Sequence, residues 1–156
     1  MFLNYGCSLM HPNSLARDDQ GYLKKHYYSC GPQALSKALS ELNNYQSAPD
    51  ISRDIQDGGN GSRLMLSLIH HEAVSITFPS EVKDFFEKNG YEVTEVDDID
   101  SLDPEKDVAL VLIWWGEPIT HNAHWLCFPA DKNIKKYLGE KTSISHIFLI
   151  KKKNGG

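Results

Sequence analysis

Residues 28–42 read YSCGPQALSKALSEL, and this stretch decides how the first half of the chain folds. Ser29 belongs to the residue types that commonly cap a helix start, and Pro32 falls in the first turn, where a proline costs no helical hydrogen bond. Apolar residues then recur at helical spacing, namely Ala34, Leu35, Ala38, Leu39 and Leu42. The pattern predicts an amphipathic helix from about Cys30 to Asn43 or Asn44.

Other helical patterns surround this one in the first half of the chain. They predict a short helix around residues 51–55, a helix from Ser62, and a helix from Ser80 to Asn89. The turn-rich run at residues 57–61 separates the first two of these. Residues 1–28 have no clear period, so we expect loop with short extended pieces there.

Beyond Gly90 the sequence is typical of β-strands. Residues 91–96 alternate between apolar and polar, and residues 108–115 (VALVLIWW) form a continuous apolar run of strand length. Further strands are expected at residues 124–128, 134–138 and 143–150. Helices followed by antiparallel strands predict one α+β domain over residues 1–150. The last residues, 151–156 (KKKNGG), are expected to form a disordered tail.

Composition narrows the class of protein. The chain has 156 residues, 40% of them hydrophobic, as expected of one soluble globular domain. The net charge of −5 argues against a nucleic-acid partner. The longest apolar run, residues 108–115, is too short to span a membrane. The first residues lack a secretory pattern and the three cysteines lack paired spacing, so we expect a cytoplasmic protein.

No motif predicts a metal ion or a cofactor. His70-His71-Glu72 lacks the spacing of a helical zinc motif, and no pair of cysteines supplies zinc ligands. The glycine-rich run at residues 58–61 is not followed by the Lys-Ser/Thr of a phosphate-binding loop. We therefore expect the protein to use neither a metal ion nor a cofactor.

Cys30 has the surroundings of a reactive thiol. A nucleophilic cysteine must be ionised near neutral pH, and a helix N-terminus or a nearby imidazolium favours that charge. Cys30 falls in the predicted first turn, where Gly31 leaves space for a substrate backbone and the Cys30 N–H is available to an oxyanion. Cys7 and Cys127 are more typical of small core residues.

His124 is the expected general base for this cysteine. It opens the apolar stretch Trp125-Leu126-Cys127-Phe128, a strand that would hold an imidazole rigidly at the sheet edge. His121 stands in a polar stretch just before it and is the alternative base. A fold with a helical half and a sheet half can bring either histidine to Cys30.

These motifs resemble a known family. Cys-Gly-Pro-x-Ala-Leu at a helix start, followed by His-Trp-Leu-x-x-Pro on a strand, is similar to the bacteriocin-processing (double-glycine) peptidases among the papain-like cysteine peptidases. The resemblance extends over about residues 20–150. It implies a papain-like fold, a peptide or protein substrate, and acyl transfer through a thioester, with Cys30 as nucleophile and His124 as general base.

The resemblance also implies an oxyanion-stabilising glutamine shortly before the cysteine. This chain has Lys24 at that position, so we expect Gln20 to fold back toward the Cys30 sulfur instead. Lys24, Lys25 and His26 are alternative donors.

The third triad member of the family is an Asp or Asn that follows the histidine on the next strand. Glu140 stands at that offset, and a hairpin turning at residues 130–133 would place it opposite His124. Asn133 and Asp131 are the next candidates.

Three functions fit this set of residues. The leading prediction is a cysteine peptidase. The second is a papain-like acyltransferase, or an amidase acting on a small molecule, which would use the same residues. The third is a non-catalytic relative that binds a peptide or a partner protein, and Lys24 in the place of the glutamine favours it.

Overall fold

Four α-helices precede the sheet in the computed structural model, which describes residues 17–58, 76–115, 122–131, 134–139 and 142–154. They are α1 (Lys24–Tyr27), α2 (Cys30–Glu41), α3 (Ala48–Asp57) and α5 (Pro79–Lys88). The helices predicted around residues 30–43, 51–55 and 80–89 are thereby confirmed, and the one predicted from Ser62 lies outside the described residues. Within those ranges no helix has both the length and the apolar content that crossing a bilayer requires.

Helix α2 forms for the reasons that its sequence suggests. Its N-cap is Ser29, and the apolar stripe Ala34, Leu35, Ala38 and Leu39 is buried. The helix ends before Asn43, which adopts a left-handed backbone conformation with φ of 56°, as asparagine does more readily than most residues. The Ser29 hydroxyl donates to the His26 carbonyl oxygen at 2.9 Å instead of accepting from the first turn.

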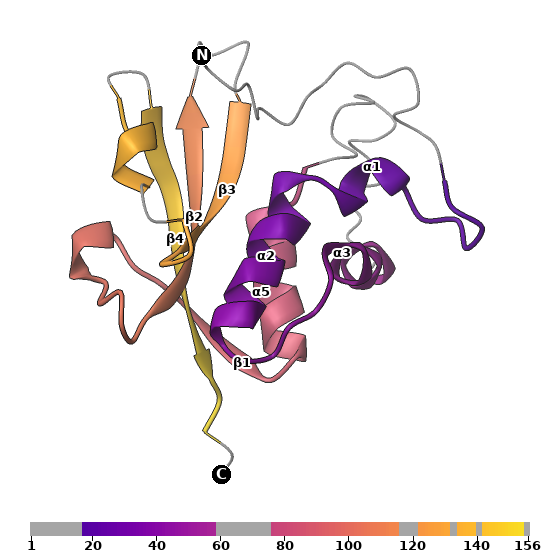
Figure 1. Ribbon diagram of the computed structural model, residues 1–156, viewed down its shortest axis with the longest axis horizontal. Coiled ribbons are helices and arrows are strands. Elements are labelled where there is room, and N and C mark those ends of the chain that lie inside the picture. The colour runs from indigo at the N-terminus through magenta and orange to yellow at the C-terminus, as the bar shows by residue number, and fades with distance from the viewer. Residues whose placement is uncertain (1–16, 59–75, 116–121, 132–133, 140–141, 155–156) are drawn as a thin grey trace.

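The described residues of the second half of the chain form a four-stranded antiparallel sheet. Its strands are β1 (Tyr91–Glu95), β2 (Val108–Trp115), β3 (Asn122–Phe128) and β4 (Thr142–Lys152), in the spatial order β1-β4-β2-β3. Figure 1 shows the α-helices gathered against one face of this sheet. The α+β class predicted from the sequence is confirmed.

Apolar side chains cover both faces of the sheet. Leu110 and Leu112 of β2 face the helices in a core that includes Leu35 and Phe86. The alternate residues of β2, among them Val111, belong to a second cluster on the other face. Because both faces are covered, β2 is apolar throughout and does not alternate.

Three local predictions differ from the structure. Residues 134–138 were expected to form a strand, but Ile134–Tyr137 is a 3-10 helix, η3, because Ile134 and Leu138 both pack into the second cluster while the lysines between them are exposed. Residues 151 and 152 were expected to belong to a disordered tail, but they are the last residues of β4, with Lys152 opposite Tyr91. The stretch expected to be loop before Cys30 contains α1.

Candidate functional site

Cys30 is the first residue of α2, and its side chain is half-buried. Helix α2 packs on β2 and β3. Figure 1 shows α2 and β3 side by side and running in the same direction, so both begin at the same end of the molecule. Cys30 and Ala123, near the start of β3, both pack at the margin of the core beneath the helices. The nucleophile predicted from sequence therefore lies at a helix N-terminus against an antiparallel sheet.

Thr77 fills the space beside the first turn of α2. A Cβ placed on Gly31 would lie 2.0 Å from Thr77 Oγ1, so only glycine fits there. The Thr77 carbonyl oxygen also accepts a hydrogen bond from Trp125 Nε1 at 2.8 Å. The space at Gly31 was expected to receive a substrate backbone, and that expectation is wrong because Thr77 occupies it.

His26 is fully buried below this turn. Its Nδ1 lies 2.6 Å from Ser52 Oγ and its Nε2 lies 3.0 Å from Thr77 Oγ1. With both ring nitrogens hydrogen-bonded, His26 connects α1 to α3 and to the segment before α5. It is therefore unsuited to the role of oxyanion donor, for which it was an alternative.

Gln20 is exposed in a turn. Asp18 Oδ1 accepts the backbone N–H of Gln20 at 2.9 Å and that of Tyr22 at 3.0 Å, which fixes the turn. Tyr27 donates its hydroxyl proton to Asp18 Oδ2, and this hydrogen bond is the main reason why the pKa of Asp18 is lowered to about 2. The turn thus holds Gln20 at the surface, and the structure does not bring it to the Cys30 sulfur.

His124 lies on β3, but on the face of the sheet away from the helices. Side chains alternate along a strand, and its neighbour Trp125 belongs to the core beneath the helices. The cross-strand partner of His124 is Ile113, a member of the second cluster.

A ring contact agrees with this placement. The His124 ring lies 6.5 Å, centroid to centroid, from that of Tyr137 in η3, which packs over the second cluster. Cys30 lies on the opposite, helical side. The catalytic role of His124 remains a prediction, and this orientation does not support it.

Of the three candidates for the third triad residue, only Asp131 belongs to the described residues. Glu140 and Asn133 lie outside the described residues, and so does His121. Asp131 lies beyond the other end of β3, where Oδ2 accepts the Cys127 N–H at 2.8 Å and Oδ1 pairs with Lys37 Nζ at 2.6 Å. The hairpin expected to follow His124 is absent from the described residues, because η3 takes the place of the strand.

The two described cysteines differ sharply in environment. Cys127 is buried on β3, and burial, helped by the nearby Asp131 carboxylate, raises the pKa of its thiol to about 12. Cys30 is half-buried at the end of a helix. Cys7 lies outside the described residues. The structure thus supports the core role predicted for Cys127 and leaves Cys30 as the accessible thiol of the two.

His146 forms a polar pair to which the sequence analysis assigns no role. Its Nδ1 lies 2.6 Å from Glu95 Oε1, and Lys83 Nζ lies 3.5 Å from Glu95 Oε2. The His146 hydrogen bond is the main reason why the pKa of Glu95 is lowered. The only trace of this pair in the sequence is that a histidine directly precedes the apolar stretch Ile147–Ile150.

Metal binding finds no support in the described ranges, where no three His, Cys, Asp or Glu side chains are grouped as a metal site would require. His70-His71-Glu72 lies outside them. Comparison of the chain with protein-family models, with curated proteins and with solved structures finds no match. The candidate site at the start of α2 therefore rests on its own residues.

Proposed function

We propose that this chain is a papain-like cysteine hydrolase that cleaves a peptide through a thioester at Cys30. The observation that carries the proposal is the position of Cys30, a half-buried first residue of α2 at the end where β3 begins. Helix N-terminal N–H groups favour a thiolate, and no side-chain hydrogen bond from Ser29 caps those of α2.

The chemistry is acyl transfer in two steps. The Cys30 thiolate attacks the peptide carbonyl carbon, the C–N bond breaks, and the leaving amine takes a proton from the general acid. Water, deprotonated by the same group, then hydrolyses the thioester and restores the thiol. In this reaction the Cys30 backbone N–H, in the first turn of α2, would stabilise the oxyanion.

Two histidines are candidates for the base in this proposal. His124 fits the family resemblance, although its ring faces η3. His121 is the alternative that the sequence offers. Substituting each histidine by alanine separates them, because loss of the true base removes activity almost as completely as loss of the nucleophile.

A second function is favoured by the orientation of His124. A chain with the same architecture but no base beside Cys30 would bind a peptide without cleaving it. In that case Cys30 would be an ordinary thiol with no enhanced reactivity.

The deciding experiment measures the alkylation of Cys30 and Cys127 by iodoacetamide and by a papain-type epoxide at neutral pH, with mass-spectrometric assignment. We expect both reagents to label Cys30 selectively, and faster in the folded chain than in denaturant, where Cys30 is an ordinary thiol. Hydrolysis of a peptide library should then be lost in Cys30→Ala and in one of the two histidine variants. Labelling of Cys30 in the folded chain no faster than in denaturant, with no cleavage by the unmodified chain, would favour the binding function. Transfer of the acyl group to an added amine would identify an acyltransferase.

A further inference from the structure

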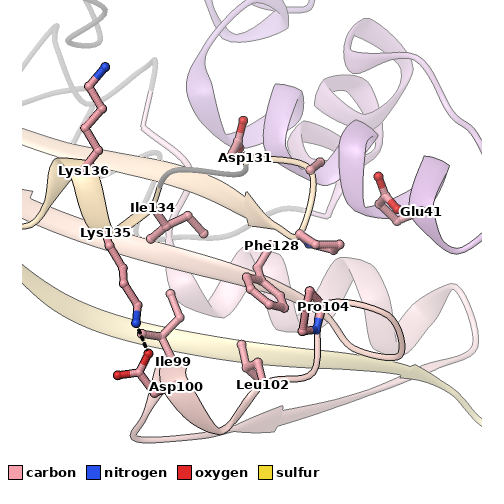
Figure 2. A pocket seen from close by; sticks show the side chains of 12 residues that line it. Glu41, Ile99, Asp100, Leu102, Pro104, Phe128, Asp131, Ile134, Lys135 and Lys136 are labelled. Carbon is pink, nitrogen blue, oxygen red and sulfur yellow. Dashed lines mark ion pairs between the residues drawn. The ribbon is translucent and has the colours of Figure 1, made fainter.

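A pocket of about 840 Å³ lies at the other end of α2, where β3 finishes. Figure 2 shows Phe128, Leu102 and Ile134 together in it, with η2 (Ile99–Ser101) and η3 contributing to its walls. Its size is within the range of small-molecule sites, roughly 300–1,000 Å³. Its surface is mostly apolar, as is typical of such sites. Of the residues that the sequence offers for catalysis, only Asp131, an alternative third triad member, lines this pocket.

Most of the charges around this pocket are neutralised by partners. Lys135 forms an ion pair with Asp100, drawn as a dashed line in Figure 2, and Asp131 pairs with Lys37 at 2.6 Å. The Lys136 chain extends away from the apolar residues in the same view. Neither Glu41 nor Lys136 forms an ion pair within the described residues, so Glu41 is the one acidic side chain lining this pocket that lacks a cationic partner there.

The position of Glu41 strengthens its negative field. Glu41 is the last residue of α2, and the carbonyl groups at a helix C-terminus carry partial negative charge. The last turn of α2 contains no basic residue. An acidic side chain here is unfavourable for the helix alone, and a cation beside it would relieve that cost.

We propose that this pocket binds a small-molecule amine with an apolar body. The apolar body contacts Phe128, Leu102 and Ile134, and the ammonium group lies beside the Glu41 carboxylate at the end of α2. The half-buried ring of Phe128 also offers a π face to a cation. The inference is independent of the reaction proposed at Cys30.

The test titrates the full chain, carrying Cys30→Ala so that the thiol cannot react, with three probes of one shape. These are 2-phenylethylamine, the carboxylate 3-phenylpropionate and the neutral 2-phenylethanol, followed by calorimetry and by amide shifts in NMR spectra. We expect the amine to bind best. Glu41→Gln should weaken it about tenfold, as loss of a charge-assisted contact does. The matched variant Glu92→Gln, at an exposed position on β1, should leave it unchanged.

A second variant tests the location. Ala130→Leu places extra apolar volume in the pocket and should weaken all three probes while leaving the fold intact by circular dichroism. The proposal is overturned if the carboxylate binds as well as the amine, if Glu41→Gln and Glu92→Gln behave alike, or if the amine shows no saturable binding at millimolar concentrations.

Discussion

Thr77 lies in the space that the missing side chain of Gly31 leaves, with Thr77 Oγ1 2.0 Å from where a Cβ on Gly31 would stand. The same residue accepts the Trp125 indole N–H and contacts the His26 ring. One threonine thus joins the first turn of α2 to β3 and to α1. The position of Cys30, next to Gly31, depends on this junction.

Gly31→Ala should therefore destabilise the fold by about 1–3 kcal/mol, the usual cost of overfilling a packed site. The measurement is the free energy of unfolding in urea. Gly139→Ala is the matched control, because a Cβ there meets nothing within 4 Å. Combining Gly31→Ala with Thr77→Gly should recover part of the loss. Equal stability of the two alanine variants would show that Thr77 moves aside freely.

Cys127 should resist alkylation in the folded protein up to about pH 10, because its buried thiol ionises near pKa 12 and only the thiolate reacts. In denaturant it should react like an ordinary cysteine. Asp131→Asn removes a nearby negative charge and should move the onset of labelling to lower pH. Native labelling of Cys127 near pH 8 at the rate seen in denaturant would contradict the burial described above.

Tyr27→Phe should change the pH dependence of stability. The hydrogen bond from Tyr27 lowers the folded-state pKa of Asp18 from 3.8 to about 2. A carboxyl group whose pKa is lowered on folding stabilises the protein when the pH is above its pKa in the unfolded chain. That stabilisation is lost as the pH falls through its pKa in the folded protein. The free energy of unfolding of the wild type should therefore exceed that of Tyr27→Phe most above about pH 4. The difference between the two should shrink toward pH 2.

Urea unfolding across this pH range measures the effect of Tyr27→Phe. Tyr45→Phe is the control, because Tyr45 is 73% exposed and is not among the residues that hydrogen-bond to Asp18. A difference between wild type and Tyr27→Phe that does not vary with pH would show that Asp18 titrates normally.

The end of β4 should contribute measurably to stability. Lys151 and Lys152 pair with Glu92 and Tyr91, and the Lys153 N–H donates to the Gly90 carbonyl oxygen at 3.1 Å. In a chain ending at residue 150 the free energy of unfolding should be lower by on the order of 1–3 kcal/mol, which is the net contribution of a few backbone hydrogen bonds. A chain ending at residue 154 is the control and should match the full chain. Identical melting temperatures for both would mean that these pairs add nothing.

Much of the fold could be predicted because its signals are strong and local. The stripe from Ala34 to Leu42 and the unbroken apolar run of β2 each exclude other structures. The strand predicted at residues 134–138 is wrong because the pattern there is short. Ile134 and Leu138 are spaced as on one turn of helix, but so short a stretch also fits a strand.

The site could be predicted less well, for a different reason. The sequence shows that His124 shares a strand face with Leu126 and Phe128, while Trp125 and Cys127 share the other. Both faces are apolar, so alternation alone does not say which one meets the helices. That choice depends on tertiary packing, here on α2 covering Trp125 while η3 covers the other face.

Helix α2 also sets a fixed distance between the two proposed sites, the reactive thiol at Cys30 and the amine-binding pocket at Glu41. Cys30 and Glu41 are the first and last of its 12 residues, so at the usual helical rise per residue they are separated by about 16 Å along the helix axis. A reagent on the thiol and a small amine at the carboxylate cannot touch. Both can therefore be present in one sample, and any change in the labelling rate of Cys30 when the amine is added measures what the helix transmits along its length.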